Sequence, residues 1–358
     1  MNSVLIISAL LIVCFPFLFS LPAFCRFFAV NEGHNVGDAI GGITAPIIGL
    51  VSILLLCVTL KAQKDAEYRS SLENRIFQMI SLHRRNVEEM HSDAKNKDGQ
   101  DVFKMIMNQI EESLEEIAPF FEGLSVDNCY QDGFLMCLQE AVEEVDPIAF
   151  AKLDIAYSTV YLGTRKEYIE TLEDVLSKRY KRDFVKLIVH YLQLKPVKNY
   201  KEGFKQWVEF NSWETNSKTA LVSSIVNNKP SMGLVHINLL TKGTHTLFYW
   251  GHEFRLAHYF RHLFSTVEYI DSQEELTFKE KSDYVKLLRT QISNTEQILF
   301  FANSITEMGA FWELFNKQKN RGDGYISKYE LIKNIPQKEV FGISYQKVYP
   351  NVDYEFKS

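Results

Sequence analysis

The chain has 358 residues, with 39 Lys plus Arg against 45 Asp plus Glu, 46% hydrophobic residues and a mean hydropathy of -0.13. These averages exclude a multi-span transporter, a disordered tail and a disulfide-dense secreted chain. The net charge of -6 also argues against a protein that works mainly by coating nucleic acid. The averages nevertheless conceal where the charged residues are missing.

Two charge-free runs occupy the N-terminal part. No charged side chain occurs over the 25 residues from Met1 to Cys25, or over the 22 residues from Ala39 to Leu60. At 1.5 Å per helical residue the second run covers roughly 33 Å, against a hydrocarbon core of roughly 30 Å. The first run lacks the leading basic residues and the small-residue cleavage site of a secretory signal, so we interpret it as an uncleaved anchor. Residues 1–60 are therefore predicted to form a two-span transmembrane hairpin.

The basic residues next to these runs predict the orientation of the hairpin. Lys61, Lys64, Arg69 and Arg75 follow the second run, whereas Arg26 is the single base between the two runs. Positively charged flanks stay in the cytoplasm, so the C-terminal part is expected there, and two spans return the N-terminus to the same side. In a bacterium this is a multi-pass inner-membrane protein with both termini in the cytoplasm.

Small residues line one face of the second run. Gly37, Gly41, Ala45 and Gly49 recur at every fourth position, which lets another helix approach closely. The neighbour is either the first span of the same chain or a second copy in a homo-oligomer that builds a pore. Neither run holds Asp, Glu, Lys, Arg or His at mid-depth, so the sequence does not support an ion-coupled transport site.

The remaining residues predict a mainly α fold with at most minor β structure. Residues 61–240 are expected to form a long connecting helix and a helical cytoplasmic region, and residues 241–358 a C-terminal helical region. Beyond the connecting helix, apolar periodicity and breaker residues favour helices at 103–117, 129–145, 148–162, 166–179, 183–194, 246–272, 278–303 and 305–318. Residues 199–240 are less readable, with one short strand expected at 235–239.

Two histidine patterns are candidates for a metal site or a catalytic site. His258 and His262 lie one helical turn apart, but His252 is too far round to complete a metal site, and no His-Glu-x-x-His pattern occurs. Arg255 with His262, and Arg85 with His91, fit the Arg and His spacing of HEPN ribonucleases, in which Arg holds phosphate and His transfers a proton. Because this spacing is short and degenerate, a ribonuclease remains an alternative.

Other charged groups favour structural roles. The glutamates 111, 112, 115 and 116 are interpreted as a solvated helix face, and the basic run 178–182 as a solvated helix end, with nucleic-acid contact as its alternative. Arg261, Arg289 and Glu296 stand in apolar helices, where a buried Arg and Glu pair would fix two packed helices. No phosphate loop, dinucleotide fingerprint or nucleophile elbow occurs, so we expect no enzyme, cofactor or small-molecule substrate.

Two blocks of the sequence form a recognisable pattern. The first comprises Gly37-Asp38-Ala39-Ile40-Gly41-Gly42, Pro46, Thr59-Leu60, Phe77, Leu82 and His83. The second comprises His258-Tyr259-Phe260-Arg261-His262-Leu263-Phe264, Tyr269-Ile270-Asp271, Tyr284, Leu288-Arg289, Gln291-Ile292-Ser293, Glu296 and Asn303. Together they cover about a third of the chain and resemble the phage abortive infection (AbiC-like) membrane protein family, which supplies no catalytic residues to carry across.

The resemblance implies antiphage defence by killing or arresting the infected cell. Two-span proteins of this kind also look like the membrane effectors of retrons, in which a reverse transcriptase with its RNA-linked DNA holds a toxic partner inactive. The function expected is therefore an effector that disrupts the inner membrane when released from inhibition. The partners expected are membrane lipids, further copies of the chain and such an inhibitory complex. A membrane-tethered HEPN-like ribonuclease and a non-toxic membrane-anchored scaffold remain the alternatives.

Overall fold

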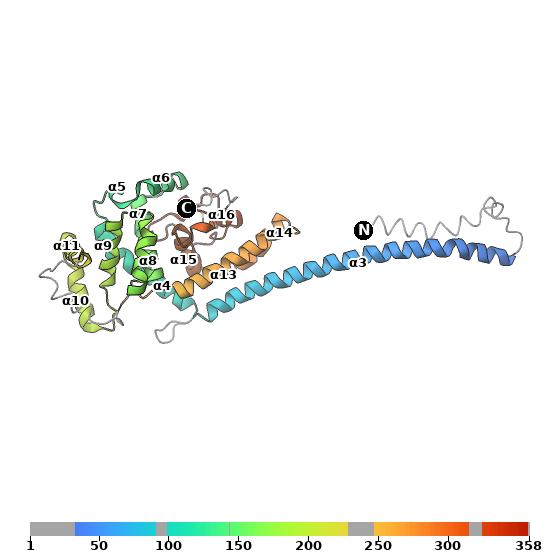
Figure 1. Ribbon diagram of the computed structural model, residues 1–358, viewed down its shortest axis with the longest axis horizontal. Helices are drawn as coiled ribbons and strands as arrows, with labels where there is room; N and C mark the ends of the chain where they lie inside the picture. The colour runs from blue at the N-terminus through green and yellow to red at the C-terminus, as the bar shows by residue number, and fades with distance from the viewer. Residues whose placement is uncertain (1–32, 91–98, 143, 228–246, 315–323, 357–358) are drawn as a thin grey trace. The chain divides into compact units, whose positions relative to one another are not determined.

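A computed structural model describes residues 33–90, 99–142, 144–227, 247–314 and 324–356. Within these ranges the chain forms α-helices and short 3-10 helices, three isolated β-bridges and no β-sheet, as the mainly α prediction requires (Figure 1). The chain divides into two units, Met1–Gln78 and Met79–Ser358. The expected first span and the expected strand at 235–239 lie outside the described residues.

Helix α3 runs from Gly33 to Glu88, 56 residues without a break. It is the one helix among the described residues that is long and apolar enough to cross a membrane. Six large apolar side chains in its N-terminal part are more than half exposed: Ile48, Leu50, Ile53, Leu54, Leu56 and Leu60. Side chains of this kind are usually buried, so this surface suits lipid rather than water. The other span of the predicted hairpin is not among the described residues.

The helix continues well beyond the charge-free run. The 28 residues from Lys61 to Glu88 add roughly 42 Å of helix at 1.5 Å per residue. This confirms the prediction that a long helix continues beyond the second charge-free run. Leu72, Ile76, Ile80, His83 and Val87 are buried at spacings of three or four residues, which marks one face of the helix.

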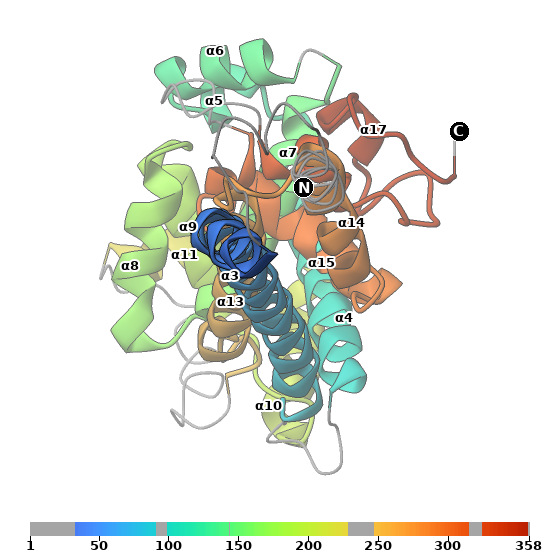
Figure 2. The same cartoon turned by 90° about the vertical axis from the view of Figure 1, so that its right-hand side faces the viewer.

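Helix α7 (Pro147–Leu162) is one of the most buried helices of the second unit. Asp146 caps its first turn by accepting a hydrogen bond of 3.0 Å from the Ile148 backbone N–H, and Pro147 supplies a preset first helical position. Nearly all its side chains from Phe150 onward are buried, which places it in the core. Helices α4 (Gln100–Ile117), α8 (Lys166–Ser177) and α15 (Asn294–Ile305) pack against it (Figure 2).

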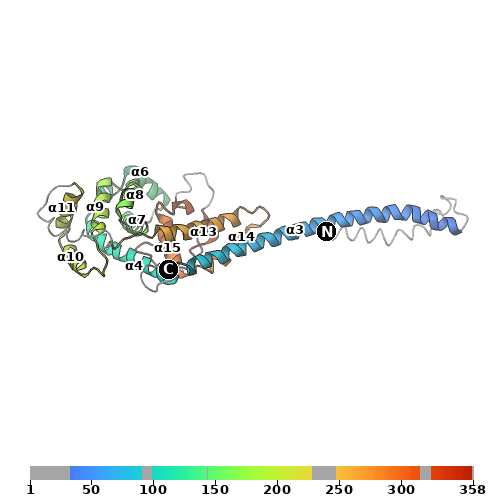
Figure 3. The ribbon, with the colours of Figure 1, turned by 60° about the horizontal axis from the view of Figure 1, so that its bottom comes forward.

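The other helices surround this core. In chain order they are η1 (Ala118–Phe120), α5 (Val126–Cys129), α6 (Asp132–Ala141), α9 (Arg182–Gln193), α10 (Lys201–Asn211), α11 (Thr215–Val226), α13 (Glu253–Asp271), α14 (Phe278–Arg289), η2 (Ala310–Trp312), α16 (Tyr325–Tyr329) and α17 (Tyr345–Val348). Helix α9 packs between α8 and α11, and α13 packs against α7 and α14 (Figure 3).

Several predicted helix boundaries were wrong. The single helix expected at 278–303 is two helices, α14 and α15, because Ser293 begins a new helix with a capping box to Glu296. The helix expected at 305–318 contains only the short η2 among its described residues, since α15 ends at Ile305. Two regular helices, α10 and α11, lie within residues 199–240, for which the sequence pattern predicted no helix.

Two glycines bring the end of α7 against the start of α13. Gly163 has φ +84°, and a Cβ atom there would lie 2.4 Å from the carbonyl oxygen of Trp250. A Cβ atom at Gly251, with φ +98°, would lie 2.5 Å from the carbonyl oxygen of Leu162. Only glycine permits both this backbone conformation and this approach. The contact fixes where α13 begins.

Candidate functional site

A cluster of buried polar rings lies where the last turns of α3 meet α13. His83 is fully buried, with its ring centroid 4.9 Å from that of Tyr259 and 5.9 Å from that of His262. Tyr259 also contacts Phe103 of α4, at 5.1 Å between ring centroids. We call His83, Tyr259, His262 and Glu296 the His83 cluster. All four belong to the second unit.

Several polar atoms of the His83 cluster are buried without a hydrogen bond. Among the described residues, neither ring nitrogen of His83 has a hydrogen-bond partner, nor does His262 Nδ1. The Tyr259 hydroxyl interacts with the Glu296 carboxylate, which helps to raise the pKa of Tyr259. Each unsatisfied buried polar group costs about 1–3 kcal/mol. The unsatisfied nitrogens of His83 therefore reduce the stability of the contact between the end of α3 and α13.

Burial keeps the histidines of the cluster neutral. It lowers the pKa of His83 from 6.5 to about 4, with a smaller contribution from His262. Burial also lowers the pKa of His262, and His258, which is exposed on the next turn, adds to that shift. For Tyr259, burial raises the pKa well above 10, and the Glu296 carboxylate raises it further. At neutral pH these rings therefore carry no charge.

Glu296 connects the cluster to two helix ends. One carboxylate oxygen accepts hydrogen bonds from the Ser293 backbone N–H at 2.7 Å and from Gln100 Nε2 at 2.9 Å. The Ser293 hydroxyl donates to Gln100 Oε1 at 2.7 Å. The first turn of α4 is thereby joined to the N-terminus of α15, beside the ring of Tyr259.

The chemistry available to the cluster is limited. A general base works best with a pKa near the operating pH, which His83 at about 4 does not have. No three His, Cys, Asp or Glu residues lie close enough to hold a metal ion in the parts of the chain that the structure describes. His83 is therefore poorly suited to act as a general base at neutral pH.

The residues of the family signature take mainly structural positions. Phe260 stacks on Phe300 at 6.0 Å, and Asn303 Nδ2 donates to the Tyr157 hydroxyl at 3.0 Å, which joins α15 to α7. Arg289 is buried and donates to the Glu330 carbonyl oxygen at 2.8 Å. Arg261 is exposed, and its Nε donates to the Ala257 carbonyl oxygen at 3.0 Å.

The expected buried Arg and Glu pair between two packed helices does not form among these residues. Arg289 takes Glu330 as its ionic partner, at 3.7 Å, while Glu296 binds the helix ends described above. Arg179 and Asp154 instead form a fully buried ion pair, at 2.8 Å. The Tyr180 hydroxyl donates to the same carboxylate at 2.7 Å.

This pair also corrects the interpretation of the basic run 178–182. Arg179 and Tyr180 lie in the core, so only the other three side chains match a solvated helix end. The prediction that the four glutamates of α4 form a solvated face was likewise wrong for two of them. Lys195, which is 2% exposed, lies 2.7 Å from Glu112 and 2.5 Å from Glu116, whereas Glu111 and Glu115 remain exposed. Periodicity alone did not show that a lysine from the segment after α9 would be buried against α4.

The structure places the nuclease candidates in separate environments. Arg255 Nη1 lies 3.2 Å from His252 Nδ1, and its guanidinium group lies over the ring of Phe254. His252 in turn is 2.8 Å from Gln109 of α4, whereas His262 stacks on His83. Arg85 is exposed on α3, and its predicted companion His91 lies outside the described residues.

The small-residue positions Gly37, Gly41, Ala45 and Gly49 all fall within α3. Ala45 is exposed, and no heavy atom lies within 4 Å of a Cβ atom built at Gly49 among the described residues. The structure therefore leaves room beside this part of the face.

Comparison with known proteins bears on the helices that form the His83 cluster. Residues 251–340 match the model of a family described as "Putative phage abortive infection protein". The resemblance seen in the sequence is thereby confirmed. The matched segment contains α13, α14, α15 and α16, and with them Tyr259, His262 and Glu296. No curated protein and no solved structure matches the chain. The family match supports a role in phage defence.

Proposed function

We propose that the chain is a membrane effector of abortive infection, which a restraining partner holds inactive and which damages the inner membrane of the infected cell when released. The observation that carries the proposal is the continuity of α3. One helix joins an exposed apolar segment of membrane-spanning length to the His83 cluster in the family-matched helices.

The His83 cluster explains how such a helix could be released. Ile80, Val87 and Met90 provide apolar contacts for the last turns of α3, but His83 between them is buried without hydrogen bonds. The contact between the end of α3 and α13 would therefore exchange between a packed state and a released state. A partner that binds one of these states more tightly shifts the population toward it.

We also propose the two-span topology with cytoplasmic termini, and homo-oligomerisation through the small-residue face. A single apolar helix encloses no channel, so damage to the bilayer needs further helices from the same chain or from other copies. The resemblance to retron effectors favours a reverse transcriptase with its RNA-linked DNA as the restraining partner. An adjacent reverse transcriptase gene would support this assignment, and its absence would contradict it.

Induced expression in a bacterium tests the proposed activity. Membrane potential, followed with a dye, should collapse within minutes while total RNA stays intact. The variant Gly41→Leu plus Gly49→Leu should insert normally and leave the potential unchanged, because two leucines block close approach on that face.

The matched control enlarges the opposite face of the same helix, as Ile47→Phe plus Leu54→Phe, and should depolarise cells as the unchanged chain does. If the double leucine variant inserts and still depolarises cells, the small-residue face is not the surface that assembles. RNA fragmentation that precedes depolarisation and disappears in His262→Ala would instead identify the ribonuclease alternative.

A further inference from the structure

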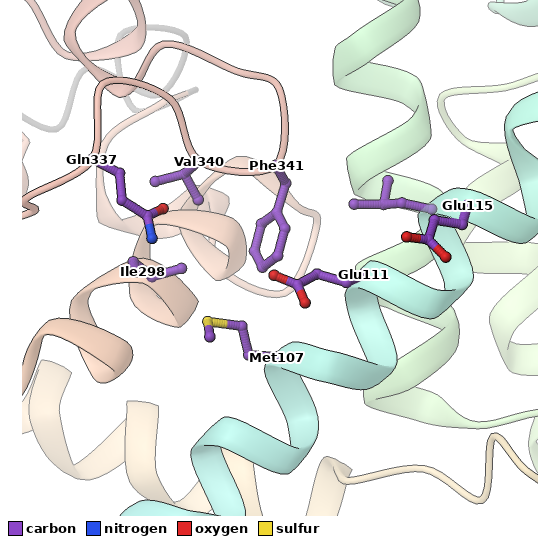
Figure 4. A pocket seen from close by; sticks show the side chains of 8 residues that line it. Met107, Glu111, Glu115, Ile298, Gln337, Val340 and Phe341 are labelled. Atoms are coloured by element: carbon purple, nitrogen blue, oxygen red, sulfur yellow. The ribbon is translucent and has the colours of Figure 1, made fainter.

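A hollow of about 260 Å³ opens on the second unit, between α4, the start of α15 and the turn at residues 340–343 (Figure 4). Met107, Leu114, Ile298 and Val340 give it an apolar lining. Enclosed small-molecule sites usually measure about 300–1,000 Å³ and bury most of their ligand. This hollow is smaller and open to solvent, so it suits a single side chain presented by a protein surface.

Two carboxylates stand on the α4 side of the hollow. Glu111 and Glu115 line it one helical turn apart, and both are exposed. Like charges at this spacing repel each other, and a cation placed between them would remove the repulsion. The neighbouring Glu112 and Glu116 already bind Lys195.

An aromatic ring faces these carboxylates from a strained turn. The Val340 N–H donates to the Ile343 carbonyl oxygen at 2.8 Å, and the Ile343 N–H returns a bond of 3.0 Å to Val340. Phe341 and Gly342 occupy the two central positions with φ of +52° and +80°. Asn-Gly is the usual pair for such a turn, and a bulky residue at positive φ is costly. The Phe341 ring nevertheless points into the hollow, toward Glu111 and Met107 (Figure 4).

We infer that this hollow is the docking site for an arginine side chain, flanked by apolar residues, on the protein that restrains the effector. Arginine fits because its planar guanidinium binds carboxylates in a bidentate manner and stacks on an aromatic face. Its aliphatic stem would lie against the apolar lining. The inference rests on the proposed function for the identity of the partner, whereas the preference for arginine rests on the hollow alone.

A tripeptide probe tests the preference directly. The full chain in lipid nanodiscs is titrated with N-trifluoroacetyl-Leu-Arg-Leu-amide, and binding is followed by 19F NMR of the peptide. Two comparison peptides replace the central arginine. Norleucine at this position has no charge, and glutamate has the opposite charge. The arginine peptide should bind at least tenfold more tightly than either. Equal affinities for the arginine and norleucine peptides would overturn the inference.

Substitutions locate the binding. Glu111→Gln plus Glu115→Gln should abolish the preference for arginine. Glu167→Gln plus Glu170→Gln, on the exposed side of α8, should leave it intact. Phe341→Asn should weaken the arginine peptide at least tenfold while the melting temperature stays equal or rises, because asparagine tolerates positive φ. Unchanged binding in Phe341→Asn would show that the ring does not form the site.

The peptide assay and the cell assay separate the two proposals. If the unchanged chain never depolarises cells but still prefers the arginine peptide, the proposed function fails while the docking site stands. If cells depolarise but the peptide preference is missing, the docking site fails alone. With the restraining partner co-expressed, Glu111→Gln plus Glu115→Gln should release depolarisation that the unchanged chain does not show. Continued restraint in that variant would contradict the docking site.

Discussion

At the scale of single residues, His83 connects the charge state of the second unit to its stability. Its pKa in the folded chain is about 4, below the ordinary value of 6.5. Between these two pH values the unfolded chain binds more protons than the folded one, so the free energy of unfolding falls as the pH falls. Above about pH 6.5 the penalty is absent.

We therefore expect acidification from pH 7.5 to 5 to cost the unit about 2 kcal/mol through His83, at 1.36 kcal/mol for each pKa unit. Thermal unfolding of the full chain in detergent, followed by tryptophan fluorescence at both pH values, measures this loss. His83→Phe should remove that part of the acid sensitivity, whereas His190→Gln, outside the His83 cluster, should retain it. Equal acid sensitivity of His83→Phe and the unchanged chain would show that His83 does not bear the titration.

The Arg179 and Asp154 pair shows how residue type misleads when it is read without burial. Arg179 lies among four other basic or aromatic residues, a composition typical of a solvated helix end. Its guanidinium group instead binds Asp154 from α7 and the Ile305 carbonyl oxygen at the end of α15. Loss of one partner of such a buried pair costs about 3–5 kcal/mol, which is typical of a core position.

At the scale of helices, capping explains why one predicted helix is two. Thr277 begins α14 and Ser293 begins α15, each with a capping box to the glutamate three residues later. The box at Thr277 is exposed, whereas the box at Ser293 is partly buried and also binds Gln100 of α4. The second box therefore holds two helices as well as starting one.

Ser293→Ala should consequently destabilise the chain by about 1 to 2 kcal/mol, and Thr277→Ala by about 0.5 to 1 kcal/mol, within the usual range for N-cap replacements. Chemical denaturation of the two variants in detergent compares them. In the background Gln100→Ala the cost of Ser293→Ala should shrink, because the shared hydrogen bond is already lost. Equal costs for the two cap replacements would mean that the Gln100 contact contributes nothing.

At the scale of the whole molecule, α3 carries a segment that is long and apolar enough to cross a membrane. Leu54 is 53% exposed, one helical turn from the exposed thiol of Cys57. Arginine at the centre of a membrane helix costs about 2.5–3.5 kcal/mol to insert. Leu54→Arg should therefore raise the labelling of Cys57 by a membrane-impermeant maleimide several-fold in isolated membranes, measured by mass spectrometry of the Cys57 peptide.

Tyr68→Arg is the matched control for the membrane placement. Tyr68 lies on the same helix beyond Lys61, where the sequence becomes charged, and it is exposed. This variant should leave Cys57 protected. If Cys57 in the unchanged chain reacts as fast as a free thiol in solution, the segment around it does not lie in a bilayer.

The sequence by itself determined the helical class, the membrane-length apolar helix and its continuation, and the family of residues 251–340. These follow from periodicity, missing charge and local motifs, which act over neighbouring residues. Only the tertiary structure decided that His83 meets Tyr259, that Lys195 binds the acidic run, and that Phe341 faces Glu111. Such contacts join residues far apart in the chain: burial gives His83 and Lys195 their roles, and the turn at residues 340–343 directs Phe341 into the hollow.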